Sequence, residues 1–249
     1  MSQLPINWSV VLLGTVANKL VDGSHNPPAK SDEGHPMLSA RNINERQIVF
    51  DDFRLIEPSA FEVENRRTDI APGDVLLTIV GAIGRSAVVP VGLPKFTLQR
   101  SVAVIEPSKA IDPSFLSYVF EGPTLQAWLY DNAKGTAQKG IYLKKLATAE
   151  IPLPPLPEQH RIVAKIDSLF ARSKRARQHL EHVVQATSAR KLIDKLEQAI
   201  LAKAFRGELV PQDPNDEPAS VLLERIRTAQ SAQSAGSGRA GRSKKVAAR

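Results

Sequence analysis

The chain has 249 residues, of which 42% are hydrophobic, enough for one folded domain and an extension. It has no cysteine, which excludes disulfides and thiolate metal sites, and no run of about 18 apolar residues that could span a membrane. These features, with a polar N-terminus that lacks a signal-peptide core, predict a cytoplasmic protein. The net charge of +7 is uneven: residues 1–157 carry −1, 158–206 carry +6, 207–228 carry −3 and 229–249 carry +5.

Residues 1–157 are expected to form a compact mixed domain in which strands precede helices, so the predicted fold class is α+β. Asp112 is placed as a helix N-cap and Gly122 as a break between two helices. The expected elements are a short helix at 12–20, a loop at 22–28, strands at 74–80, 85–91 and 99–106, and helices at 112–121 and 123–132.

A proline-rich hinge at 152–157 precedes about fifty residues, 158–206, that contain neither proline nor glycine. This composition predicts one long helix of about 75 Å, a spacer or a rod that binds a partner. Its charge fits either a solvated rod or attraction to phosphates or an acidic partner.

Apolar residues along this predicted helix step by four and three, as in a coiled coil, and we expect them to pair with a second chain. Ser173 interrupts the seam with a small residue, and the ten-residue step from Val183 to Ile193 breaks its register. The predicted dimerisation residues are Ile162, Ile166, Leu169, Ala176, Leu180, Val183, Ile193, Leu196 and Ile200.

The C-terminal part is expected to begin where Gly207 ends the helix. A turn and a short helix, 207–228, follow, with the helix at 219–227. Residues 229–249 are small, polar and basic, and we expect a disordered tail.

Catalytic motifs are weak in this chain. Asn26-Pro27-Pro28-Ala29 is similar to an adenine methyltransferase motif, but alanine replaces the aromatic residue that stacks on the base, and no glycine-rich cofactor loop accompanies it. No Asp/Glu-x-Lys nuclease motif occurs, and the five histidines show no metal-ligand spacing. The sequence predicts a binding protein rather than an enzyme, with no catalytic or metal site.

Two glycine-flanked segments are candidate binding loops. The segment 73–85 permits close approach of another backbone, or is a hairpin that needs positive φ. The segment 135–140 offers amides and a lysine to a phosphate, or is a flexible connector.

Several motifs in a fixed order resemble the specificity subunit of type I restriction–modification systems, in a form with a single target-recognition domain. They are Trp8, Asp22-Gly23-Ser24-His25, Arg41-Asn42-Ile43, residues 73–78 with Gly81 and Gly84, Gly135-Thr136-x-Gln138, residues 151–163 and residues 199–210. Together they span nearly the whole chain except the tail.

The resemblance implies a non-catalytic subunit with a target-recognition domain at 1–157 and a helical spacer at 158–206. It implies partners: double-stranded DNA, read at one half-site of a bipartite target, and modification and restriction subunits that supply the S-adenosylmethionine, ATP and Mg²⁺ chemistry of DNA methylation and restriction. The family's usual subunit has two recognition domains and two spacers, so we expect a homodimer, or pairing with another half-subunit.

Base and phosphate contacts require polar side chains in loops. The candidate DNA-binding residues are Asn26, Arg41, Asn42, Arg66, Arg67, Arg85, Gln99, Arg100, Lys134, Gln138 and Lys139. A stand-alone DNA-binding regulator with the same domain is the alternative function.

Overall fold

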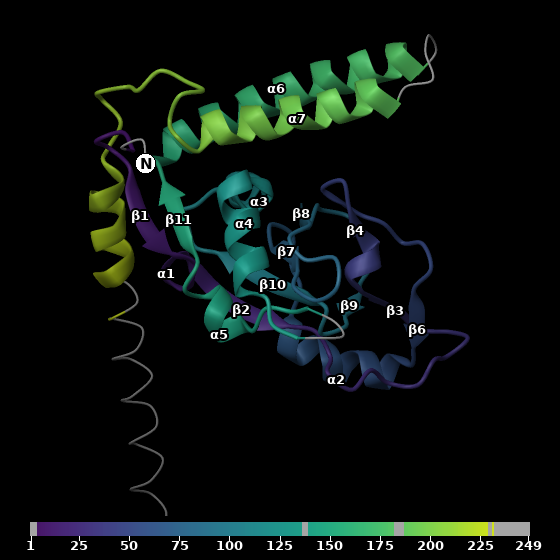
Figure 1. Cartoon of the computed structure of the whole chain (residues 1–249). Coiled ribbons are helices and arrows are strands. Elements are labelled where there is room, and N and C mark those ends of the chain that lie inside the picture. The colour runs from purple at the N-terminus through teal and green to yellow at the C-terminus, as the bar shows by residue number, and fades with distance from the viewer. Residues whose placement is uncertain (1–3, 136–138, 182–186, 229–230, 232–249) are drawn as a thin grey trace, which may run out of the picture.

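The computed structural model describes residues 4–135, 139–181, 187–228 and 231 (Figure 1). Strands and helices form a mixed α+β domain with two long helices along one side. The strands are β1 Ser9–Leu12, β2 Ala17–Asp22, β3 His35–Leu38, β4 Ile43–Asn44, β5 Gln47–Ile48, β6 Arg54–Ile56, β7 Val75–Thr78, β8 Ser86–Val88, β9 Thr97–Leu98, β10 Val102–Pro107 and β11 Glu150–Leu153. The helices are α1 Leu13–Val16, the 3₁₀ turn η1 Ala40–Asn42, α2 Pro58–Thr68, α3 Pro113–Glu121, α4 Pro123–Asn132, α5 Leu143–Leu146, α6 Leu156–Glu181 and α7 Thr187–Ala204.

A four-stranded antiparallel sheet, in the order β2-β10-β7-β8, separates two hydrophobic cores. Side chains alternate between the two faces of a strand. Val75 and Ile105 therefore lie in the first core, whereas Leu76 and Val104 lie in the second. Because both faces are covered, β7 is buried at every position. The predicted strands at 74–80, 85–91 and 99–106 correspond to β7, β8 and β10.

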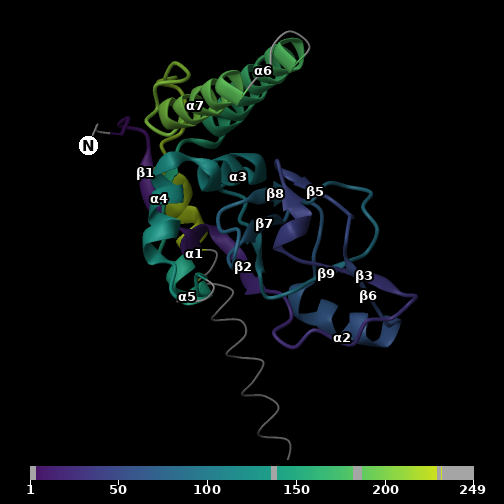
Figure 2. The same ribbon diagram turned by 45° about the vertical axis from the view of Figure 1, so that its right-hand side comes forward.

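The first core is covered by α3, α4, α6 and α7, and the second by what we call the outer lobe, residues 24–70 and 89–101. The outer lobe contains the three-stranded sheet β6-β3-β9, the β4–β5 hairpin and α2. Figure 2 shows the outer lobe and the α6/α7 pair on different sides of the four-stranded sheet.

The predicted helix at 12–20 is wrong. Only the single turn α1 is helical, between β1 and β2. β2 pairs antiparallel with β10, with Val21 opposite Val104. This long-range pairing satisfies the backbone and overrides the local preference for a helix.

The predicted helices at 112–121 and 123–132 are confirmed as α3 and α4. Asp112 is the predicted N-cap, because its Oδ1 accepts a hydrogen bond of 2.8 Å from the Phe115 backbone N–H.

A single helix over 158–206 is not confirmed, because α6 and α7 lie side by side (Figures 1 and 2). They are antiparallel: Ser173 Oγ donates to Glu197 Oε1 at 3.0 Å, and Arg177 Nη2 donates to Asp194 Oδ1 at 2.9 Å. An apolar helical stripe needs a cover, and its spacing does not say whether the cover is another chain or the same chain. Residues 182–186, next to the predicted register break, lie outside the described residues.

The C-terminal segment packs back on the start of the chain. Residues 219–228 are helical, as predicted, and Ala219 N donates to Asn7 O at 3.1 Å. Arg161 on α6 pairs with Asp216 at 2.6 Å. The predicted disordered tail at 229–249 lies outside the described residues, apart from residue 231.

Candidate nucleic-acid interface

A polar hollow of about 540 Å³ lies where the loop after β2, η1 and the turns after β7 and β9 meet. A second hollow of about 380 Å³ shares His25, Val80 and Arg100 with it, so the two are adjacent. We call this combined surface the polar face. The first hollow is lined by His25, Pro27, Ser39, Ala40, Arg41, Val80, Gly81, Ala82, Arg85, Gln99, Arg100 and Ser101. The second is lined by Asp22, His25, Ile79, Val80, Arg100, Lys134, Gly135, Gly140, Ile141, Tyr142 and Leu143.

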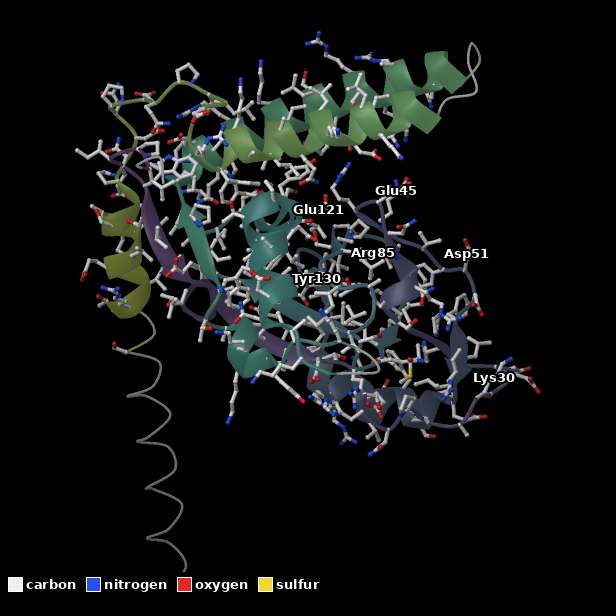
Figure 3. All side chains as sticks on the ribbon, viewed as in Figure 1. Lys30, Glu45, Asp51, Arg85, Glu121 and Tyr130 are labelled. Atoms are coloured by element: carbon white, nitrogen blue, oxygen red, sulfur yellow. The ribbon has the colours of Figure 1, made fainter. Side chains whose placement is uncertain are left out.

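Arg85 is held by the turn between β7 and β8. Its backbone N–H donates to Thr78 Oγ1 at 2.9 Å, and the same hydroxyl donates to the Ala82 carbonyl. Gly84 has a φ of 92°, a conformation that suits glycine, and Gln126 Nε2 on α4 donates to its carbonyl at 2.8 Å. Residues 73–85 thus contain β7 and lead into β8, the hairpin that was one of the two predicted alternatives, and these hydrogen bonds fix the backbone of an exposed arginine. In Figure 3 Arg85 lies between Tyr130 of α4 and Asp51 of the outer lobe.

Gln99 and Arg100 are held by the end of β2. Ser24 N donates to Leu98 O at 2.8 Å, and Arg100 N donates to Ser24 O at 2.9 Å. A Cβ on Gly23 would lie 2.1 Å from Leu98 O, so only glycine permits this approach.

The predicted loop at 135–140 joins the same face. Lys134 and Gly140 exchange two backbone hydrogen bonds of 2.8 Å, and Gly81 N donates to Lys139 O at 3.1 Å. The two glycine-flanked segments that the sequence presents separately are thus neighbours. Gln138 lies outside the described residues.

The arginines of the first hollow differ in their partners. Within the described part of the chain, the Arg85 and Arg100 side chains have no carboxylate partner. Arg41 pairs with Asp52, but both side chains are largely exposed, so water weakens the attraction. Among the described residues no acidic side chain lines this hollow, whereas three arginines do, so an anion is favoured there.

Asn42 is wrong as a predicted DNA contact. It is only 1% exposed, and its Oδ1 accepts from Ser39 N at 2.9 Å. Its Nδ2 donates to Val49 O at 3.0 Å and Asp51 O at 2.7 Å. The side chain holds the loop that presents Arg41 and cannot reach a base.

The remaining candidates are more scattered. Arg67 forms an ion pair with Asp22 at the edge of the second hollow, and Lys139 Nζ lies 4.6 Å from the Tyr130 ring centroid. Asn26 and Arg66 are exposed but are not among the lining residues.

Sequence reasoning missed His25 and Ser39 as parts of this face. His25 lines both hollows, and its Nε2 lies 2.7 Å from Asp22 Oδ2. The signal was its position in the loop at 22–25, which was noted as a motif but not as a contact.

The predicted dimerisation residues separate into three groups. Ile162, Ile166, Ile193 and Ile200 are buried, Leu169 is partly buried, and Leu196 and Ala176 are exposed. For Leu180 and Val183 the side chains lie outside the described part of the chain. Ile162, Ile166 and Ile200 pack in the chain's own first core, so a seam facing a second chain is not confirmed.

Other chemistry finds little support in the described residues. No group of three or more His, Cys, Asp or Glu side chains there could hold a metal ion. No helix in that part of the chain is long and apolar enough to cross a membrane.

The sequence and the fold of this chain have known relatives. A family model described as "Type I restriction modification DNA specificity domain" matches residues 5–183, so the chain belongs to this family. It is 34% identical over 241 residues to the EcoBI specificity subunit of Escherichia coli, covering 92% of the chain and 49% of that relative. It is 30% identical over 242 residues to the EcoKI specificity subunit of E. coli strain K12, covering 88% and 48%.

A crystal structure of the HsdS subunit from Thermoanaerobacter tengcongensis has a similar fold. The TM-score is 0.52 at 27% identity, over 84% of this chain and 47% of that one. The chain therefore spans about half the length of the relatives it matches. These relatives are specificity subunits, and the alternative of a stand-alone regulator gains no support from them.

Proposed function

We propose that this chain is a DNA sequence-specificity component of a type I restriction–modification complex and reads one half-site of a bipartite target. The observation that carries the proposal is the pair Arg85 and Arg100, fixed at the backbone in one hollow and lacking carboxylate partners among the described residues. Family membership supports the same conclusion.

The chemistry of the polar face suits duplex DNA. An arginine fork can donate two hydrogen bonds to guanine O6 and N7, and a glutamine can pair with adenine N6 and N7, each worth about 1–3 kcal/mol of discrimination. Arg85, Arg100 and Gln99 supply these groups, while Arg41 and Lys134 suit phosphates.

Most of the affinity for DNA is expected to come from regions outside residues 1–157. Residues 1–157 have a net charge of −1, whereas residues 158–206 carry +6. Residues 1–157 then contribute sequence discrimination, while the helices, the basic tail and the partner subunit contribute most of the salt-dependent attraction to phosphates.

In this proposal the chain is not catalytic by itself. Modification and restriction subunits dock on it and bring S-adenosylmethionine, ATP and Mg²⁺. Its cytoplasmic location stays a prediction from the sequence.

We propose further that two copies, or this chain and another half-subunit, pair through the helices. α7 covers α6 through Ser173–Glu197 and Arg177–Asp194, and a second copy's α7 could make the same contacts by exchange. Leu192 and Leu196 on α7, 69% and 53% exposed, offer an additional apolar surface to a partner.

A cysteine pair tests this exchange. The chain has no native cysteine, so Ser173→Cys and Glu197→Cys in one chain would be the only thiols. Oxidation at micromolar concentration, read by non-reducing electrophoresis, is expected to give a covalent dimer. Only intramolecular disulfide, together with a monomer in sedimentation, would contradict exchange.

The function itself is tested by purifying the chain with a type I modification subunit. The complex is expected to methylate DNA at a defined bipartite sequence, and neither protein alone should do so. Methylation or cleavage by the chain alone, or complex formation without sequence preference, would overturn the proposal.

A further inference from the structure

Arg46 lies at the junction of the outer lobe and the helical side of the molecule. It occupies the two-residue turn between β4 and β5, and its Nη1 donates to Glu121 Oε2 on α3 at 2.9 Å. Its guanidinium carbon lies 4.7 Å from the Phe170 ring centroid on α6 and 5.7 Å from that of Tyr118 on α3. One side chain of the outer lobe thus touches two helices, α3 and α6, on the other side of the fold.

The turn that presents Arg46 is strained. Glu45 and Arg46 have φ values of 48° and 60°, a region that two-residue hairpins fill with Asn-Gly or Gly-Gly. Such conformations persist when surrounding contacts hold them in place, and they cluster where position matters for function. Figure 3 shows Glu45, the neighbour of Arg46 in this turn, below the α6/α7 pair.

The residues that contact Arg46 also join α3 to α6. The Tyr118 hydroxyl donates to Asp167 on α6, and the Tyr118 and Phe170 rings meet edge to face at 5.9 Å. Burial raises the pKa of Glu121, and the attraction of Arg46 opposes that rise. An arginine that pairs with a carboxylate and lies near the faces of two aromatic rings has a defined orientation that a lysine cannot reproduce.

We propose that Arg46 is a positioning residue that fixes the orientation of the outer lobe, and with it the polar face, relative to α6 and α7. The consequence for DNA rests on the proposed function. When a target has two half-sites, the orientation of the polar face relative to α6 and α7 sets the length of the gap between half-sites that the protein accepts. Arg46 does not line either hollow, so it acts on the gap rather than on the bases.

The orientation of the outer lobe relative to α6 can be measured without DNA. Spin labels on Lys30→Cys in the outer lobe and Lys174→Cys on α6 would report one distance in the full chain, which has no other cysteine. Diluting labelled with unlabelled chains removes distances between copies. Arg46→Met, and separately Glu121→Gln in case the first variant folds poorly, should broaden or shift the distance distribution. Arg172→Met, an exposed arginine on α6, is the matched control and should leave it unchanged.

A distribution identical to that of the unsubstituted chain in both Arg46→Met and Glu121→Gln would overturn the inference. Arg46→Lys should give an intermediate result, because it keeps the charge and loses the fork.

The consequence for DNA is tested in complex with a modification subunit, on a library of targets whose gap varies by single base pairs. Arg46→Met is expected to lower the preference for the native gap by roughly tenfold, about the effect of one charge-assisted hydrogen bond, with base preferences unchanged. An unchanged gap preference, an equal loss at every gap or altered base preferences would overturn it. If the unsubstituted chain shows no site-specific methylation, the proposed function fails, and the distance measurement still decides the role of Arg46 in orientation.

Discussion

The polar face and the α6/α7 pair both contain arginines, and the partners of these arginines differ. On the helical side two partly exposed arginines pair with carboxylates: Arg177 with Asp194 and Glu197, and Arg161 with Asp216. On the polar face, Arg85 and Arg100 meet none among the described residues. A paired arginine holds parts of the fold together, whereas an unpaired arginine on a rigid turn keeps its donors free for an anion or a base edge.

The two regions also differ in what holds them. The α6/α7 pair packs on the domain because Ile162, Ile166 and Ile200 are buried in the first core. The polar face is built from turns, which depend on single glycines and on side chains that bond to the backbone. Substitutions should therefore have larger effects on the stability of the turns than on that of the helix surface.

The largest effect is expected from Gly23→Ala. Its Cβ would lie 2.1 Å from Leu98 O, so the loop that fixes Arg100 must shift, and the free energy of unfolding should fall by about 3 kcal/mol or more. Denaturant unfolding measures this. Gly92→Ala, whose Cβ meets open space, is the control and should lose about 1 kcal/mol through its positive φ alone. Equal losses in the two variants would contradict the close approach.

Asn42→Ala comes next. It leaves up to three backbone groups of Ser39, Val49 and Asp51 without their buried partner, so stability should fall by about 2 kcal/mol. Asn44→Ala, at an exposed position of β4, is the control and should change little. The DNA sequence that is methylated by the complex of Asn42→Ala with the modification subunit should stay the same. A changed preference at normal stability would restore Asn42 as a direct base contact.

A smaller, pH-dependent effect is expected from Glu158→Gln on α6. Burial raises the pKa of Glu158 above its unfolded value, despite the hydrogen bond from Gln212 and the nearby Arg161. The folded state thus favours the protonated carboxyl, and stability from this group falls as pH rises above the unfolded value of about 4.3. The melting temperature of Glu158→Gln relative to the unsubstituted chain should therefore be more favourable at about pH 7.5 than at about pH 4.5. A difference that does not vary with pH would argue against a buried, titrating carboxyl.

The smallest effect is expected from Arg177→Met. Its partners Asp194 and Glu197 are 61% and 24% exposed, so the loss of stability should stay below about 1 kcal/mol. Arg172→Met on the same helix is the control for a general change of charge. A much larger loss would mean that ion pairs, rather than the apolar seam, hold α7 on α6.

The sequence predicted three strands of the central sheet, β7, β8 and β10, together with α3 and α4, because alternation, caps and breaks are local signals. It predicted a helix where β2 lies, because the pairing of β2 with β10 is a long-range contact. It did not predict the reversal between α6 and α7, because a helical stripe is equally apolar whether its own chain or another covers it. In the site, Arg41, Arg85, Gln99 and Arg100 were predicted and share one hollow. Asn42 was assigned wrongly because local sequence does not show that its amide turns inward.

The central claim is that Arg85 and Arg100 read bases from the polar face. Methylation sequencing of cells that carry this chain with its modification subunit, compared with cells that carry Arg85→Ala, Arg100→Ala or the control Arg172→Ala, tests it most directly. We expect each hollow variant to relax the methylated sequence at one position of the half-site, by about 1–3 kcal/mol of discrimination, and the control to keep it. An unchanged methylated sequence in both hollow variants would contradict the account.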